Sequence, residues 1–284
     1  MAGLAEQWQE EGIAIERWGR AELQQHEPAL LEAWDAHRLR AVYHVPEEAQ
    51  VRNPRLLQAL AASCQVRGVA LLEKAGEGRW STRGERVDAW QCAYGTVTAA
   101  TFCVAAGAWS YRLLEQLGVT TGILPIRGQM VLFALEKPLI HRILNEGSRY
   151  LVPRQDGLLL AGSTEEEAGY CKETTPEAVE QLASFARRLL PQLAGVPVAR
   201  AWAGLRPGSF DGLPYLGQAG PWENVYVCAG HFRSGLYLAP ATAQVMADLL
   251  LGQTPRIDLA PFSLNRASCR LRSTRYDTAH HGSG

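Results

Sequence analysis

The sequence lacks an excess of charge of either sign. Its 28 lysine and arginine residues are balanced by 29 aspartate and glutamate residues, which leaves a formal charge of −1 at pH 7. Nucleic acids and anionic membranes attract strongly basic surfaces, so neither class of partner is expected here. Hydrophobic residues make up 47% of the chain and charged residues 20%, which is typical of a folded globular protein.

Long hydrophobic runs and regular cysteine spacings are also missing. The longest apolar stretch, residues 97–109, is too short and too rich in threonine to span a bilayer, and the acidic start of the chain has no signal-peptide core. The six cysteines form no C-x-x-C pair, and no histidine pair has the spacing of metal ligands. These absences predict a cytoplasmic protein without a metal site or a disulfide framework.

Helical and strand-like segments alternate in an order that predicts a mixed fold of the α+β class. Residues 4–34 favour two or three short helices, and residues 53–64 favour a helix with Asn53 as its cap and Pro54 at its first position. An amphipathic helix is expected at 176–190 and another from about Pro240 to Leu251. Strands are expected at 40–45, 69–73, 96–106, 128–134, 150–153, 158–162, 198–204, 215–217 and 225–229.

The segment AGHFRSGLYL (229–238) is the richest candidate for a binding site. It places a glycine loop between a strand and a helix, an arrangement that offers unpaired backbone N–H groups to an electron-rich ligand. His231 and Arg233 add polar side chains on the loop. An ordinary turn without a ligand remains an open alternative.

A second candidate is Arg206, between Leu205 and Pro207. Proline restrains the residue before it to an extended conformation, so the guanidinium should project from the end of a strand, where it can bind a carboxylate through two hydrogen bonds. A structural ion pair with an acid such as Asp211 is the alternative. Tyr150 could reach the same cleft or be an ordinary core tyrosine, and Trp109 could contact a cofactor or fill the core.

Five segments resemble, in the same order, the FAD-dependent amine oxidoreductases of the D-amino acid oxidase superfamily. They are VAAGAWS (104–110), PIRGQM (125–130), YLVPR (150–154), WAGLRPGSFDGLPYLG (202–217) and AGHFRSGLYLAPAT (229–242). The resemblance extends over nearly all of residues 4–266 and is strongest to the glycine oxidase branch associated with thiamine biosynthesis.

The resemblance implies two interleaved lobes. A partial FAD-binding lobe, Rossmann-like but without its first βαβ unit, would comprise residues 48–122 and 204–264. An antiparallel-sheet substrate lobe would comprise residues 1–47 and 123–203, and residues 265–284 would form a disordered tail.

The implied chemistry is oxidative deamination of glycine, or of another small amino acid or secondary amine. Arg206 would bind the substrate carboxylate, Tyr150 would donate its hydroxyl to it, and Arg233 would help to shape the site. The implied FAD-binding residues are Gly107, Trp109, Arg127, Gly128, Gln129, Gly204, Leu205, His231, Phe232, Ser234, Gly235 and Leu236. By analogy with glycine oxidases, the protein would form a homo-oligomer and act on a small-molecule substrate.

The sequence departs from the family pattern at one point. The family begins with a strand, a G-x-G-x-x-G fingerprint and a helix, and the nearest glycine pair here, Gly76 and Gly78, has no third glycine. We therefore expect the chain to start inside the substrate lobe and to bind FAD weakly or not at all. The alternatives are an inactive remnant, or a D-amino acid or sarcosine dehydrogenase-like enzyme that uses another electron acceptor.

Overall fold

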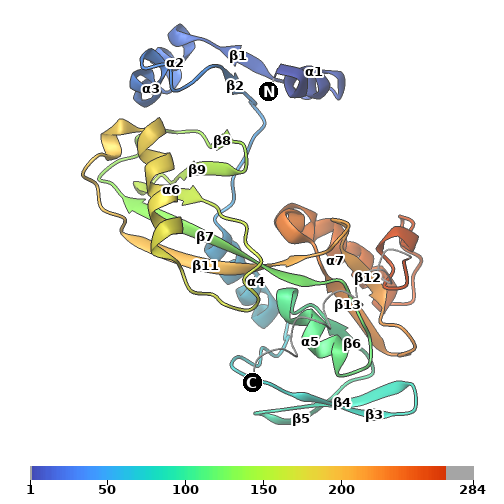
Figure 1. Cartoon of the computed structure of the whole chain (residues 1–284). Helices are drawn as coiled ribbons and strands as arrows, with labels where there is room; N and C mark the ends of the chain where they lie inside the picture. The colour runs from blue at the N-terminus through green and yellow to red at the C-terminus, as the bar shows by residue number, and fades with distance from the viewer. Residues whose placement is uncertain (1, 267–284) are drawn as a thin grey trace, which may run out of the picture. The chain divides into compact units, whose positions relative to one another are not determined.

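The computed structural model describes residues 2–266, so most of the tail predicted at 265–284 lies outside the described residues (Figure 1). The chain divides into two compact units. Unit 1 contains the residues up to Ser63 together with 128–165 and 172–204. Unit 2 contains 64–127, 166–171 and the residues from Leu205 onward.

Unit 1 is built around a five-stranded sheet with the order β11-β7-β10-β9-β8. β10 pairs antiparallel with β7 and with β9, and β9 pairs antiparallel with β8. The strands are β7 (Leu124–Ala134), β8 (Leu144–Glu146), β9 (Arg149–Pro153), β10 (Leu158–Gly162) and β11 (Arg200–Gly208). β7 and β11 each continue from one unit into the other.

Helix α6 (Pro176–Leu189) lies across this sheet, as Figure 1 shows. The hydroxyl of Thr175 caps its first turn by accepting a hydrogen bond from the amide of Ala178. Its apolar face, which includes Leu182 and Leu189, is buried in the same core as Phe133 of β7. The amphipathic helix expected at 176–190 is confirmed, as are the strands expected at 150–153 and 158–162.

Short elements precede the sheet. The helices are α1 (Ala2–Glu10), α2 (Arg20–His26), α3 (Leu31–Asp35) and α4 (Asn53–Val66), with 3-10 turns η1 (Pro28–Leu30) and, after α6, η3 (Pro191–Leu193). β1 (Glu16–Trp18) and β2 (Val42–His44) pair antiparallel. α4 has no buried residue, and its Leu57 is 66% exposed.

Unit 2 contains two three-stranded sheets. β3 (Arg79–Arg83), β4 (Arg86–Cys92) and β5 (Gly95–Thr98) form an antiparallel sheet. The other sheet has the order β12-β13-β6, and β13 (Val225–Ala229) is antiparallel to β12 (Tyr215–Gln218) but parallel to β6 (Phe102–Val104). Its helical elements are η2 (Gly107–Trp109), α5 (Ser110–Glu115), η4 (Phe232–Ser234), α7 (Gly235–Leu250) and η5 (Ala260–Phe262).

Three expectations about this unit are wrong. Residues 69–73 form no strand, because none of the described strands pairs with them. The single strand expected at 96–106 is two strands in different sheets: the side-chain amide of Asn224 donates to the carbonyl of Ala100 and holds the bend between them. The last helix starts at Gly235 rather than near Pro240, because the η4 turn leads directly into it and leaves the proline inside the helix.

Within the described residues, no helix is long and apolar enough to cross a membrane. The mixed architecture with an antiparallel sheet agrees with the expected α+β class.

Candidate active site

The strands β6 and β13 lie side by side in unit 2 and run in the same direction, so their carboxyl ends meet at one edge (Figure 1). Each strand is followed by a glycine turn, a 3-10 turn and a helix: Gly107 leads into α5, and Gly230 leads into α7. Both glycines have a positive φ, +57° and +87°, which side chains disfavour. In open α/β sheets, ligands bind beside such an edge.

The loop after β13 carries a strained backbone. Phe232 has a φ of +50°, which is uncommon for a residue with a side chain and costs about 1 kcal/mol or more. His231, one residue earlier, is held by a 3.0 Å hydrogen bond between its Nε2 atom and the hydroxyl of Thr242 in α7. Backbone strain of this kind concentrates at binding sites. The loop therefore has the properties expected of a ligand-binding segment.

The amino terminus of α7 faces no side-chain cap. Ser234 occupies the cap position, but its hydroxyl does not accept from the first turn. In the absence of a side-chain cap, the helix dipole favours a partial negative charge at this position. Of the residues predicted here, Gly235 is half-buried, whereas Arg233 and Leu236 are exposed.

Burial lowers the pKa of His231 below the ordinary histidine value of about 6.5. The unfolded chain then binds a proton more readily than the folded chain, so stability is complete above about pH 6.5 and is lost as the pH falls below it. We expect His231→Gln to reduce the loss of stability between neutral and mildly acidic pH. Urea unfolding at several pH values measures this, with the exposed His37→Gln as the control. An unchanged pH dependence in His231→Gln would contradict it.

Arg206 lies near the end of β11 and is half-buried. The acid proposed as its structural partner, Asp211, has both carboxylate oxygens hydrogen-bonded to Arg266, at 2.7 and 2.9 Å. An arginine at a strand end remains suited to the capture of a carboxylate. The role assigned to Arg206 stays a prediction.

Tyr150 lies on β9 in unit 1, directly opposite Gly162 of β10. A Cβ atom at residue 162 would come within 2.7 Å of the Tyr150 ring. Only glycine, which has no side chain, makes room for the ring at this position. The Tyr150 hydroxyl contacts the sulfur of Met130 at 3.9 Å. Tyr150 is half-buried, which is compatible with a hydroxyl that reaches a ligand.

We expect Gly162→Ala to displace the Tyr150 ring and to destabilise the protein by about 1–3 kcal/mol. The same change made in a Tyr150→Ala background should cost much less, because the clashing ring is gone. Denaturant unfolding of the two single variants and the double variant measures the difference. Gly19→Ala is the control, since only the flexible carboxylate of Glu22 lies near that position. Equal costs in both backgrounds would show that the close approach to Tyr150 is unimportant.

Two predicted flavin neighbours make extensive contacts of their own. Arg127 is 8% exposed, its Nε donates to Glu166 at 3.2 Å, and the two residues also exchange backbone hydrogen bonds at 2.8 and 3.0 Å. The Gln129 side chain is fully buried and accepts a 2.7 Å hydrogen bond from the amide of Thr175, the cap of α6. Both contacts join segments that are far apart in the sequence and therefore have a structural role. Their proposed position beside a flavin stays a prediction.

Sequence reasoning missed Glu166, because nothing in its local sequence marks it as the partner of a residue 39 positions away. It also missed Tyr170, whose hydroxyl donates to the carbonyl of Ala108 at 3.1 Å. The guanidinium of Arg112 lies 3.8 Å from the centroid of the Tyr170 ring. These contacts tie the 166–171 segment to the turn after β6.

Trp109 does not fill the core, since it is 39% exposed. With Trp80, Trp90 and Arg112 it lines an open pocket of about 1140 Å³ in unit 2. Aromatic and guanidinium groups can stack on a planar ligand, so this pocket is compatible with a cofactor near Trp109.

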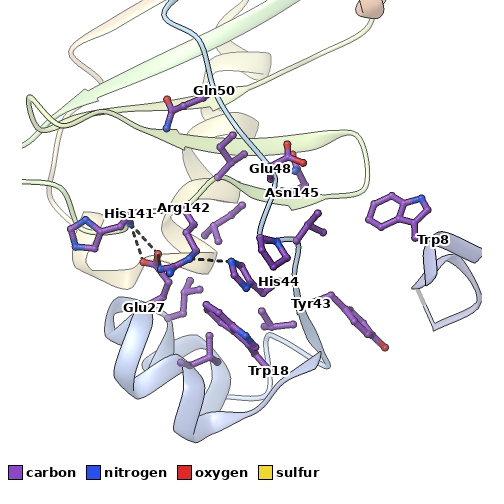
Figure 2. Close-up of a pocket in the computed structure, with 17 residues that line it drawn as sticks. Trp8, Trp18, Glu27, Tyr43, His44, Glu48, Gln50, His141, Arg142 and Asn145 are labelled. Carbon is purple, nitrogen blue, oxygen red and sulfur yellow. Dashed lines mark hydrogen bonds and ion pairs between the residues drawn. The ribbon is translucent and has the colours of Figure 1, made fainter. Parts of the chain in front are cut away.

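A different pocket, of about 370 Å³, lies in unit 1 and contains none of the predicted site residues (Figure 2). Its buried carboxylate, Glu27, accepts hydrogen bonds from the backbone amide of His141 and from Arg142. Figure 2 shows that Arg142 also reaches His44, to which its Nε donates at 3.4 Å. The ring of Trp18 lies 4.3 Å from that of His44, centroid to centroid, with the two planes tilted by 33°. The negative charge of the Glu27 carboxylate is thus balanced by Arg142, which lines the same pocket.

The predicted site residues fall in both units. Unit 1 contains Gly128, Gln129, Tyr150 and Gly204, and unit 2 contains Gly107, Trp109, Arg127, Leu205, Arg206, His231, Phe232, Arg233, Ser234, Gly235 and Leu236. Within unit 2, the strand edge and the uncapped α7 helix fit the ring end of a flavin, whose N1 and C2 carbonyl region becomes negative on reduction. The diphosphate end has no matching fingerprint in the sequence.

Comparison with known proteins identifies relatives over most of the chain. It is 41% identical over 225 residues to the glycine oxidase of Pseudomonas aeruginosa, a match that covers 79% of this chain and 62% of that protein. It is 34% identical over 215 residues to the bifunctional protein ThiO/ThiG of a Synechocystis species, covering 73% of this chain and 32% of that protein. The chain spans about three fifths of the length of the Pseudomonas glycine oxidases that it matches.

The fold shows the same relationship. The crystal structure of glycine oxidase from Geobacillus kaustophilus is similar with a TM-score of 0.82 at 30% identity, covering 91% of this chain and 69% of that one. The family model for FAD dependent oxidoreductases matches residues 1–249. The chain therefore belongs to the family of FAD dependent oxidoreductases.

Proposed function

We propose that the protein oxidises glycine, or another small amino acid or secondary amine, with FAD as its cofactor. The observation that supports this most strongly is the edge of β6 and β13 in unit 2, with its two glycine turns and the uncapped α7 helix. The same unit carries Arg206. The names of the relatives support glycine oxidation as the reaction.

The residues of the chain have distinct tasks in this proposal. Arg206 binds the substrate carboxylate through two hydrogen bonds. Donation of the Tyr150 hydroxyl to that group, which the resemblance implies, stays a prediction. Arg233 shapes the edge of the site. The first turn of α7 stabilises the negative charge that develops next to it. Together these contacts hold the α-hydrogen in one orientation, which is the main contribution that a protein makes in such a reaction.

FAD, when bound, supplies the acceptor for the hydride that leaves Cα. Overall, an amino acid, oxygen and water are converted to an oxo acid, ammonia and hydrogen peroxide. Water hydrolyses the imine product, and oxygen takes up the two electrons. A role in thiamine thiazole synthesis, a cytoplasmic location and a homo-oligomeric state belong to the same proposal.

A peroxide assay with glycine, sarcosine and D-alanine tests the proposal on the chain supplied with FAD. Peroxide and ammonia formed in equal amounts from glycine would support an oxidase. Substrate oxidation seen only with an artificial electron acceptor would favour a dehydrogenase-like enzyme. No oxidation with any acceptor, despite bound FAD, would contradict both and favour an inactive protein.

A further inference from the structure

The guanidinium of Arg266 is nearly buried and donates a hydrogen bond from every one of its N–H groups. Its Nε and Nη2 atoms hold the two carboxylate oxygens of Asp211, at 2.7 and 2.9 Å. Nη2 also donates to the carbonyl of Leu213 at 2.8 Å, and Nη1 donates to the carbonyls of Pro214 and Ser263. All five N–H groups of the guanidinium thus have acceptors. The side chain is only 7% exposed.

These acceptors lie mainly in one loop, residues 209–214, which connects β11 to β12. The guanidinium also lies 3.8 Å from the centroid of the Tyr215 ring, the first residue of β12. Tyr215 is fully buried and its hydroxyl accepts a 3.0 Å hydrogen bond from the amide of Gly122. Arg266 therefore connects the loop to the buried Tyr215 at the start of β12.

Asp211 forms the other half of this clamp. Burial raises the pKa of its carboxyl group, but the hydrogen bonds from Arg266 and from the amide of Leu213 outweigh burial and lower the pKa overall. The carboxylate is thus charged at neutral pH. Removal of Arg266 would leave a partly buried negative charge, and the loop would have to rearrange to return it to water.

The opposite end of the loop begins three residues after Arg206, where β11 ends. Gly208, two residues after Arg206, is the last residue of β11, and a Cβ atom there would lie 2.8 Å from the side chain of Ile126 in β7. The strand end is therefore packed closely on one side, and the loop that leaves it is clamped by Arg266. Both restraints act on the short segment that presents the Arg206 guanidinium.

We propose that Arg266 is a positioning residue for Arg206: it fixes the 209–214 loop so that the Arg206 guanidinium is held ready for the substrate carboxylate. This inference rests on the proposed function, because it assigns Arg206 to carboxylate binding. In this proposal Arg266 acts through the loop, because its guanidinium donates to Asp211 and to three backbone carbonyls. A bidentate contact is sensitive to small displacements of the guanidinium, so a loosened loop weakens it.

The test uses glycolate, which carries the carboxylate of glycine without an oxidisable amine. Calorimetric titration of the chain with saturating FAD gives its Kd, and hydrogen exchange of the 209–214 amides reports the state of the loop. Arg266→Met should raise the Kd about 10-fold and speed exchange of the loop, with FAD binding unchanged. Arg266→Lys, which keeps the charge but not the five-donor geometry, should recover part of the affinity.

The matched control is Arg20→Met, which removes an arginine that is likewise bidentate to an aspartate, Asp35, at 2.9 and 3.0 Å in unit 1. Its glycolate Kd should equal that of the unmodified chain. Should Arg266→Met fail to fold, Asp211→Asn decides the question, and it should raise the Kd in the same direction. An unchanged Kd in the folded variants overturns this inference alone. Failure of the unmodified chain to bind glycolate overturns the proposed function and the inference with it.

Discussion

Replacing Arg206 by methionine is expected to weaken glycolate binding about 100-fold, which corresponds to roughly 3 kcal/mol. Methionine fills a similar volume but supplies no donor, so the carboxylate would lose both its hydrogen bonds and its counter-charge. Because carboxylate binding also orients Cα, the KM for glycine should rise and kcat should fall. Titration with glycolate and steady-state kinetics on the FAD-loaded chain measure both effects.

Arg200→Met is the matched control for this change, since Arg200 is the first residue of the same strand and is exposed. Its guanidinium lies 5.8 Å from the ring of Trp202, so its loss removes a weak stacking contact and leaves the strand end intact. We expect glycolate affinity close to that of the unmodified chain. Equal losses in the two variants would mean that general charge, rather than the position of Arg206, determines binding.

The chain alone is expected to bind riboflavin and FAD with similar affinity. Both ligands carry the same ring, which the edge of β6 and β13 and the α7 helix are proposed to hold, but only FAD carries a diphosphate. The sequence contains no G-x-G-x-x-G turn to bind that group. Fluorescence titration with the two flavins measures the difference.

Adding from a longer relative a segment with the G-x-G-x-x-G fingerprint that the resemblance implies should raise FAD affinity about 100-fold or more and riboflavin affinity far less. Unit 2 offers an edge for such a segment, because β6 is the edge strand of its described sheet. The control is the same segment with its second fingerprint glycine replaced by valine. Strong preference for FAD by the chain alone would show that its own residues hold the diphosphate.

Local patterns in the sequence predicted the elements whose stability is local. The apolar stripe of α6 and the short apolar runs of β9 and β10, bounded by turn residues, identify them, because each signal lies within a few residues of sequence. The break at residues 99–101 could not be predicted in this way. It depends on Asn224, more than a hundred residues later, and the intervening small residues carry no turn signal of their own.

The candidate site shows the same distinction. The glycine loop 229–238 and Arg206 stand out in the sequence because glycine and proline mark their backbone. The pairing of Arg127 with Glu166 and that of Asp211 with Arg266 join residues 39 and 55 positions apart. No periodicity or motif indicates which acid meets which arginine, so such supports of a site are found only in the folded chain.

The central claim is that Arg206 holds an amino acid so that FAD, bound beside β6 and β13, can oxidise it. Its most direct test is anaerobic addition of glycine to the chain loaded with FAD, supplemented with the fingerprint segment if loading requires it, while the flavin absorbance near 450 nm is recorded. The account predicts that glycine bleaches the flavin of the unmodified chain completely and that Arg200→Met bleaches at the same rate. At the same glycine concentration, the rate of bleaching in Arg206→Met should be very slow. Bleaching of the Arg206→Met variant at the unmodified rate, or no bleaching of the loaded unmodified chain, would contradict it.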